Sequence, residues 1–298
     1  MRHGRIPLLL AFLLPGLALY GYFVLSPYAQ SFQVAVTDWG GLSVDYSYVG
    51  GANFRRLFSD DYFWNAIRHN LVLLLLLPVV TIAAGLFFAS MLNVAGRGIS
   101  GVRGSSIYKV VYFFPQVLSV AIIGALWNEI YNPRSGMLNG LLRAVGLDAL
   151  AKPWLGDTRY AFGALLAVMV WSNVGFYVVL FGAAMQAIPR DIYEAAQLDG
   201  AGRLATLLRI TVPLLWDTVQ VAWIYLAIIA LDGFALVQIM TRGGPAFSTD
   251  VVGLRVYDVA FGESKFGYGS AIGVAMFFMT LSVAVLALRA TRRERVEF

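Results

Sequence analysis

Cysteine is absent from this 298-residue chain, and only two histidines occur, His3 and His69. The first absence excludes disulfide bonds, thiolate nucleophiles and cysteine-ligated metals. The two histidines are too few and too far apart in the sequence to indicate a histidine metal site. A phosphate-binding P-loop, a Ser/His/Asp triad and a paired-carboxylate pocket are also missing from the sequence. We therefore expect no catalytic residue and no metal site in this chain.

Charged residues are scarce as well, at 13% of the chain, whereas hydrophobic residues make up 59% and the mean hydropathy is +0.71. Soluble domains are only about 45–50% apolar, so the composition predicts an integral membrane protein in contact with the lipid bilayer. The net charge is +5, but only three residues are Lys and the Arg lie scattered at the ends of apolar runs. A nucleic-acid partner would need a basic face, so we expect none.

Six apolar runs are long enough to cross the roughly 30 Å hydrocarbon core of a bilayer as helices. The first follows Arg2, His3 and Arg5, as a secretory signal would, but it exceeds an h-region of about 7–15 residues and lacks a clear cleavage site. We expect it to be retained. The sequence thus predicts an all-α membrane protein with a single domain over residues 1–298 and six spans, at residues 6–27, 70–93, 109–130, 161–187, 218–240 and 267–288.

The segments between the predicted spans differ in character. Residues 28–69 are polar and aromatic, which is typical of an aqueous loop. Residues 94–106 contain four glycines but lack the Gly-Lys-Ser/Thr ending of a phosphate cradle, so we interpret them as a short linker. Residues 135–146 predict a short amphipathic interfacial helix. Residues 242–265 form a further loop, with Gly243-Gly244-Pro245 as its turn.

Orientation follows from the distribution of Lys and Arg. With six spans, the termini and the second and fourth loops share one side, which carries 12 of the 22 Lys and Arg in a shorter length of chain than the 10 opposite. Because basic residues concentrate on the cytoplasmic side of membrane proteins, we predict that both termini are cytoplasmic.

A stretch rich in small and polar residues, 188–215, lies between the fourth and fifth apolar runs. Pro189 suits the first turn of a short helix. Gly200 and Gly202 interrupt that helix, because glycine tolerates the positive φ of a tight turn, and a second helical pattern runs on until Pro213. We predict a helix–turn–helix elbow on which another protein could dock closely. The alternative is a solvated loop between two membrane helices.

The spacing within this stretch resembles the EAA signature of the membrane permeases of ABC importers, whose cytoplasmic coupling helix inserts into an ATPase subunit. The matching positions, to which we add Asp199 beside the glycine, are Glu194, Ala195, Ala196, Gly200, Ile210 and Pro213. Residues 53–70, 114–146 and 241–250 resemble the carbohydrate-uptake branch of these permeases, the maltose and glycerol-phosphate type. The resemblance covers nearly the whole chain, which lacks the extra N-terminal helices and large external insertion of the largest maltose-type members.

This resemblance implies the fold of a type I importer permease in a bacterial cytoplasmic membrane. It also implies four partners for the chain: a second similar permease, two ATP-binding-cassette ATPase subunits and an external solute-binding protein. ATP and Mg would be bound by the ATPase subunits, so no cofactor and no enzymatic activity is expected in this chain.

Polar groups within predicted spans are costly in hydrocarbon and are candidate functional sites. By resemblance to maltose-type permeases, the sugar-lining positions fall at Gln116, Asn173 and the Asp232–Gly233 step. Ser119 is a further polar candidate, and the rings of Trp171 and Tyr177 could stack on a sugar. The alternatives are helix packing for the two rings, interhelical hydrogen bonds for Ser119 and Asn173, and for Asp232 an ion pair with Arg242 or a contact with the second permease.

Three functions compete at this point. The first is an importer permease for a sugar or related polyol. The second keeps the importer but makes the solute a phosphorylated polyol such as glycerol phosphate, an amino sugar or a peptide. A phosphate would favour a basic cavity, and no predicted span has an interior Lys or Arg. The third is a membrane-embedded enzyme or a channel that needs no ATPase.

Overall fold

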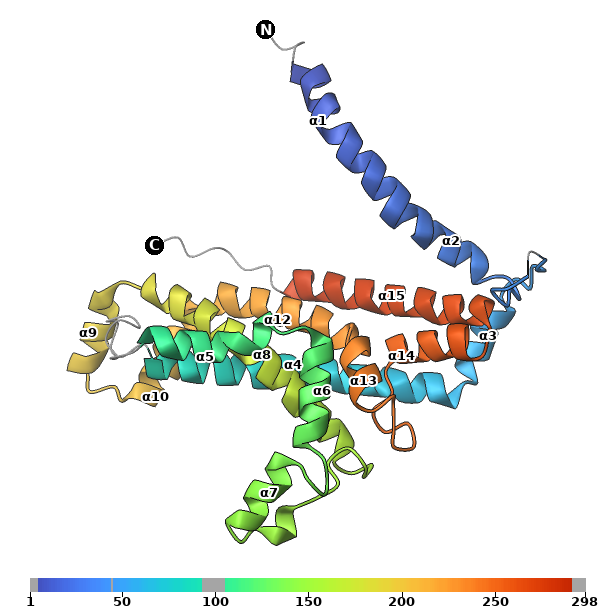
Figure 1. Ribbon diagram of the computed structural model, residues 1–298. Helices are drawn as coiled ribbons and strands as arrows, with labels where there is room; N and C mark the ends of the chain where they lie inside the picture. Colours follow the sequence, from blue (N-terminus) through green and yellow to red (C-terminus); the bar gives the residue numbers. More distant parts are fainter. Residues whose placement is uncertain (1–4, 44, 93–104, 291–298) are drawn as a thin grey trace. The chain divides into compact units, whose positions relative to one another are not determined.

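The computed structural model describes residues 5–43, 45–92 and 105–290, and these residues are mostly helical (Figure 1). The β contact found among them is an isolated antiparallel bridge between Thr37 and Tyr48. The all-α prediction is therefore confirmed for this part of the chain. The helices are α1 Arg5–Tyr20, α2 Ser26–Val34, α3 Ala52–Phe58, α4 Asp61–Leu92, α5 Ser105–Val117, α6 Val120–Ile130, α7 Met137–Ala144, α8 Ala161–Gln186, α9 Arg190–Leu198, α10 Arg203–Thr206, α11 Val212–Leu214, α12 Trp216–Leu231, α13 Phe234–Met240, α14 Val252–Tyr257 and α15 Phe266–Ala290.

Short helices of other kinds complete the chain. A 3₁₀ turn covers Asp148–Leu150, and π-helical turns cover Gly21–Leu25, Leu207–Thr211 and Asp258–Gly262. A short helix, α7, is present where the interfacial helix is predicted, and its place at a membrane interface stays a prediction. The glycine-rich linker predicted at residues 94–106 lies mostly outside the described residues.

Four helical segments are long and apolar enough to cross a membrane: Ala11–Val34, Asp61–Leu92, Ala161–Gln186 and Phe266–Ala287. Two further pairs pass the same test only together, because each is sharply bent. Val111–Val117 and Val120–Ile130 meet at 115°, and Arg203–Leu214 and Trp216–Leu231 meet at 79°. The described chain therefore offers four to six crossings, and the count of six and the cytoplasmic side of the termini stay predictions.

In two places a helix extends beyond the predicted span. The first helical segment runs on through α2 to Val34 instead of ending at residue 27, because Pro27 lies in the first turn of α2, where proline is tolerated. The second begins at Asp61 instead of residue 70. Its start is fixed by Asp60, whose Oδ1 accepts hydrogen bonds from the backbone N–H groups of Tyr62 at 3.0 Å and Phe63 at 3.2 Å.

The third and fifth predicted spans are not continuous helices. The third is divided into α5 and α6 at Leu118–Ser119, and Ser119 adopts extended backbone angles while its Oγ accepts from Ile122 N at 3.4 Å. The fifth is divided into α12 and α13 at Asp232–Gly233. The polar residues at these points, predicted to lie within spans, stand at helix ends.

The chain divides into two compact units. Unit 1 falls within Met1–Trp64 and Arg255–Leu281, and unit 2 within Asn65–Leu254 and Ser282–Phe298. The core of unit 2 is built from fully buried side chains such as Leu73, Leu165 and Phe181. In unit 2, α9 and α10 lie at one end of α5, α8 and α12 (Figure 1).

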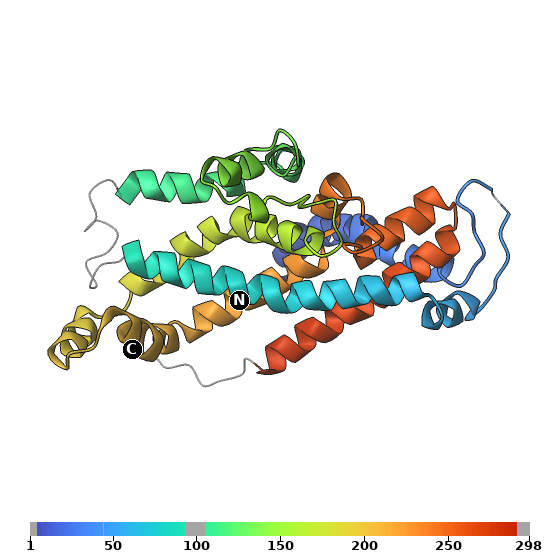
Figure 2. The same cartoon turned by 90° about the horizontal axis from the view of Figure 1, so that it is seen from below.

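Glycines allow the helices of unit 2 to approach closely. A Cβ on Gly175 of α8 would lie 1.6 Å from the carbonyl oxygen of Tyr112 in α5, so no other residue fits there. A Cβ on Gly85 of α4 would lie 2.9 Å from Cβ of Tyr177, where α4 runs beside α8 (Figure 2). A Cβ on Gly124 of α6 would lie 2.5 Å from Ile239 in α13. These contacts pack α8 against α4 and α5, and α6 against α13.

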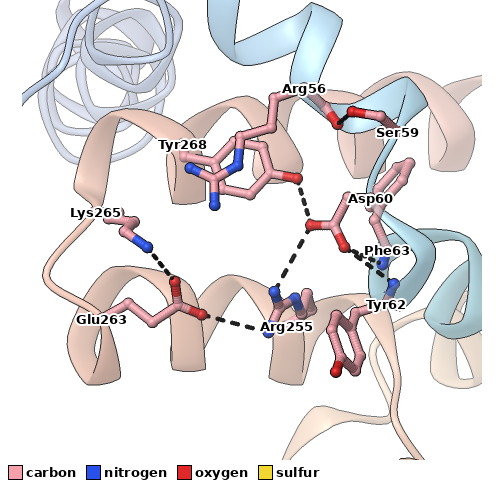
Figure 3. A network of polar contacts seen from close by, with 9 residues as sticks. All are labelled: Arg56, Ser59, Asp60, Tyr62, Phe63, Arg255, Glu263, Lys265 and Tyr268. Atoms are coloured by element: carbon pink, nitrogen blue, oxygen red, sulfur yellow. Dashed lines mark hydrogen bonds and ion pairs between the residues drawn. The ribbon is translucent and has the colours of Figure 1, made fainter.

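A polar network centred on Asp60 holds unit 1 together (Figure 3). Besides capping α4, Asp60 accepts a hydrogen bond from Tyr268 of α15 at 2.5 Å, and Arg255 of α14 lies 3.7 Å from the same oxygen, Oδ2. Burial alone would raise the pKa of Asp60, but the hydrogen bonds from Tyr268 and Phe63 and the charge of Arg255 together lower it. One carboxylate thus joins the starts of α4 and α15 to α14.

Further charges extend this network at its rim. Glu263 lies 3.6 Å from Arg255 and accepts a hydrogen bond from Lys265 at 2.7 Å, while Arg56 stacks 4.1 Å from the centre of the Tyr268 ring. The bond from Lys265 is the largest influence on Glu263 and lowers its pKa. Because the rim is partly exposed, these pairs contribute less than the half-buried centre.

Candidate functional site

A pocket of about 170 Å³ in unit 2 opens at the break between α12 and α13. Its polar lining comes from Ser172 and Asn173 of α8 and from Asp232 at the break itself. The remaining lining residues are apolar or glycine: Val120, Met169, Ile229, Gly233, Ala235 and Leu236. The lining contains no Lys or Arg, so the charge that it contributes is the carboxylate of Asp232.

The polar groups of α8 are held by their own helix. Ser172 donates to the carbonyl oxygen of Met169 at 3.0 Å, and Asn173 donates to the same oxygen at 2.8 Å and to Oγ of Ser172 at 3.3 Å. These bonds to the preceding turn satisfy the donors within an otherwise apolar helix. They also fix the direction of both side chains at the pocket wall.

Asp232 and Gly233 occupy the break. Asp232 is the C-cap residue of α12 and is exposed, and its N–H donates to Ile228 O at 3.0 Å. Phe234 N–H bonds the carbonyl oxygen of Asp232 at 2.7 Å instead of that of Ala230, its partner in an unbroken helix. The break therefore presents a carboxylate and backbone groups to the pocket.

The structure brings together three of the seven predicted pathway residues, Asn173, Asp232 and Gly233. Gln116 and Ser119 are exposed but do not line this pocket, although Val120 beside them does. The remaining two are the aromatic candidates, whose rings lie elsewhere.

Trp171 and Tyr177 are engaged in packing. The ring of Trp171 meets that of Trp127 edge-on at 5.3 Å. Tyr177 is 1% exposed and its ring lies 6.2 Å from that of Phe181, within the core of unit 2. In this conformation neither ring faces the pocket, which agrees with the packing alternative. A part in solute binding stays a prediction for both.

Sequence reasoning missed Asn70, which completes the break from α4. Its side-chain amide is fully buried and donates to the carbonyl oxygens of Ala230 and Leu231, at 3.2 Å each. Its Oδ1 accepts from Val252 N, the first residue of α14, at 2.8 Å. The sequence signal was a lone amide beside His69 at the start of an apolar run, and nothing local indicates its partners.

The predicted elbow has the expected geometry. Gly200 adopts φ +75° directly after α9, and its N–H and that of Ala201 return to the carbonyl oxygens of Gln197 and Ala196. This is a left-handed glycine cap of the kind that commonly ends helices. α10 and a π-helical turn follow. Ile210 lies half-buried in that turn and Pro213 is exposed in α11.

α9 has two different faces. Glu194, Ala195 and Asp199 are exposed, whereas Ala196 is 5% exposed and packs inward with Tyr193. The hydroxyl of Tyr193 lies 3.4 Å from that of Thr211, and burial raises the pKa of Tyr193. Leu198, which sequence analysis did not name, is 89% exposed at the end of the helix. The outward face therefore combines small residues, carboxylates and one large apolar side chain.

Comparison with known proteins identifies the family. Residues 71–296 match the model for binding-protein-dependent transport system inner membrane components. The chain belongs to this family. It is 42% identical to the diacetylchitobiose uptake system permease protein NgcF of Streptomyces coelicolor, over 97% of this chain and 83% of that protein. It is 31% identical to the multiple sugar-binding transport system permease protein MsmF of Streptococcus mutans, over 96% of this chain and 95% of that one.

Solved structures support the same fold for this permease. A chain of a bacterial alginate ABC transporter, crystallised with an alginate pentasaccharide-bound periplasmic protein, superposes with a TM-score of 0.82 at 23% identity, over 97% of this chain and 96% of that one. At this identity the likeness concerns the fold alone. Family membership and the apolar helices together make the permease a multi-pass membrane protein.

Proposed function

We propose that this permease forms half of the translocation pathway of an ATP-driven importer for a sugar or related polyol. The observation that carries the proposal is the pocket at the α12–α13 break, where a carboxylate, an amide and a hydroxyl side chain meet an otherwise apolar wall. Sugars present hydroxyl groups on a largely apolar ring framework, which such a surface complements. The Asp232 carboxylate accepts hydrogen bonds from hydroxyl groups and repels phosphate.

The size of the pocket supports a shared site. Its 170 Å³ lies below the roughly 300–1,000 Å³ of sites that enclose a small molecule. A second, similar permease facing this one would complete the cavity. The names of the relatives, an uptake permease for diacetylchitobiose and one of a multiple sugar system, support a saccharide.

The outward face of α9 is the proposed dock for an ATPase subunit. Glu194, Ala195 and Asp199 provide a low-bulk acidic surface, and Leu198 provides an apolar anchor. In this proposal, two ATPase subunits bind ATP and Mg, hydrolyse ATP and move α9, while an external solute-binding protein delivers the solute. α9 and both termini then lie on the cytoplasmic side of a bacterial cell membrane.

A saccharide panel tests the choice of solute. The complex is reconstituted with its binding protein, and ATP hydrolysis is measured with neutral saccharides, an amino sugar, a phosphorylated polyol and a peptide. We expect a neutral saccharide to stimulate hydrolysis and the phosphorylated polyol to have no effect. Stimulation by the amino sugar or the peptide alone would change the solute class, and solute flux without any ATPase would establish a channel instead.

Substitution at the end of α9 tests the dock. Leu198→Ala removes an exposed anchor, so we expect weaker ATPase binding and little change in the fold. Leu204→Ala is the matched control, because Leu204 is also exposed, at 65%, but lies beyond the glycine turn on α10. Equal ATPase binding by the parent and both variants would contradict the proposed dock.

A further inference from the structure

The loop between α13 and α14 holds an unusual backbone. Arg242, Ala246 and Phe247 have φ values of 49°, 48° and 58°, in the left-handed region that side chains other than glycine seldom adopt. Such conformations persist only where the surroundings over-determine them, and they concentrate at functional sites. Phe247 is 46% exposed in this loop, while Thr249 and Asp250 behind it are buried. The loop thus has a fixed shape and presents an aromatic side chain.

α4 supplies the groups that hold the loop. Asn65 donates to the carbonyl oxygen of Phe247 at 2.8 Å. Nδ1 of His69 lies 2.8 Å from the backbone carbonyl oxygen of Asp250. Asn70 accepts from Val252 N at 2.8 Å. Positions 65 and 69 are one turn apart, so one polar side of α4 contacts the segment 247–252 at three points.

Of these three side chains of α4, Asn70 is the one whose hydrogen bonds continue from this segment toward the pocket. The amide that accepts from Val252 also donates to the last carbonyl oxygens of α12, directly before the Asp232–Gly233 break. Ala230 O has lost its regular helical partner, because Phe234 N–H turns to Asp232 O. In a buried, low-dielectric position, these bonds are strong and their loss leaves polar groups unpaired.

We propose that Asn70 is a positioning residue that transmits the position of the 241–250 loop to the pocket at the α12–α13 break. When the external solute-binding protein contacts the loop, Val252 shifts. The side-chain amide of Asn70 moves with Val252 N, and its hydrogen bonds move the carbonyl oxygens of Ala230 and Leu231 in turn. The Asp232 carboxylate then moves relative to Asn173. This inference rests on the proposed function and adds a named coupling residue to it.

Asn70→Leu tests the transmission. Leucine has a similar volume but leaves three backbone groups without their partner. Thr81→Val is the matched control, because Thr81 is also fully buried on α4 and its Oγ1 has no hydrogen-bond partner among the described residues. Per assembled complex, we expect Asn70→Leu to lower ATP hydrolysis stimulated by solute-loaded binding protein by about tenfold, with basal hydrolysis unchanged, and Thr81→Val to stay within about twofold of the parent.

A reporter in the pocket separates transmission from assembly. The chain has no cysteine, so Ala235→Cys in the pocket lining gives a single reactive thiol. We expect loaded binding protein to change the labelling rate of this thiol in the parent and in Thr81→Val, but not in Asn70→Leu. If Asn70→Leu does not assemble, Val252→Pro takes its place. It removes the N–H that donates to Asn70 but also changes a fully buried side chain, and proline is tolerated at the first position of a helix.

The outcomes are distinct. A parent complex that imports no solute with ATP contradicts the proposed function. The role of Asn70 is overturned if the parent complex imports solute and an Asn70→Leu or Val252→Pro variant shows unchanged ATPase stimulation and an unchanged labelling response per complex. The proposed function is then left intact. A lower yield of variant complex with normal behaviour per complex assigns Asn70 to assembly and likewise overturns the inference.

Discussion

Two helical segments of unit 2 are broken within a few residues of a polar side chain. The helix ends at the two breaks are capped by different groups. At the α5–α6 break, Ser119 caps the next helix with its own hydroxyl group, three residues from the N–H that it accepts. At the α12–α13 break, Asp232 and Gly233 provide no side-chain cap. Asn70, which lies 160 positions before Ala230 in the chain, instead donates hydrogen bonds to the last carbonyl oxygens of α12. A local cap fixes one helix end, whereas a remote cap ties that end to the rest of the unit.

The largest expected difference between the breaks is in stability. Asn70→Leu leaves up to three buried backbone groups unpaired, at about 1–3 kcal/mol for each. Ser119→Ala removes one exposed cap, at about 1 kcal/mol. We expect thermal unfolding of the purified permease complex to shift much further for Asn70→Leu. Equal shifts of the unfolding temperature would show that the two caps contribute equally to stability.

The second difference concerns the solute. Asp232→Asn keeps the shape of the side chain at the pocket but removes its charge, and a hydrogen bond to a charged group contributes about 1.5–3 kcal/mol. We expect the complex to assemble with the half-saturating solute concentration raised about tenfold or more. Asp217→Asn, which removes the same charge from the exposed start of α12, is the control and should leave it unchanged. Poor assembly of Asp232→Asn would assign the carboxylate a structural role.

A third test asks whether Ser119 acts only as a helix cap. Ser119→Asp and Ser119→Gly should both unfold close to the parent, because aspartate caps helices as well as serine does and glycine costs only a few tenths of a kcal/mol. Ser119→Ala alone should be less stable. Thermal unfolding of the three variants measures this order, and a loss of transport in Ser119→Gly without loss of stability would instead favour a pathway role for the hydroxyl.

The smallest effect is expected from the charge of Asp60 in unit 1, which caps α4 locally and also contacts Tyr268 and Arg255. Its pKa is lowered in the folded chain, so its charge stabilises the fold above the ordinary carboxylate pKa, and this stabilisation is lost as pH falls through the lowered value. Asp60→Asn retains a capping side chain without the charge. The difference in unfolding temperature between parent and variant should therefore shrink in acid. A constant difference from neutral pH to strong acid would argue against this sign.

The same contrast explains what the sequence could predict. Apolar runs and the glycine turn at Gly200 are local patterns, so the helical class and the elbow followed from them. α7 followed from its amphipathic spacing in the same way. The pairing of Asn173 with Asp232 at one pocket came from resemblance to a family, because nothing in their own surroundings indicates it.

Other features could not be predicted because their causes are distant. Asn70 bonds residues 160 to 182 positions away, and no local pattern marks them. The burial of Ala196 depends on which side of α9 packs against its own chain. The breaks at Ser119 and Asp232 lie within apolar runs whose hydropathy alone predicts continuous helices. At both breaks a polar group that looked like a span residue is a helix end.

The π-helical turn at Leu207–Thr211 has a consequence for sequence comparison and engineering. A π turn holds one residue more than an α turn, so it is equivalent to a single-residue insertion. Deleting one residue there would restore regular α geometry and leave the residues that follow facing as they do now. A deletion within a regular α turn would instead rotate the rest of that helix by about 100°. An alignment gap for a relative without the extra residue therefore belongs in this turn, where it keeps the residues of α12 equivalent.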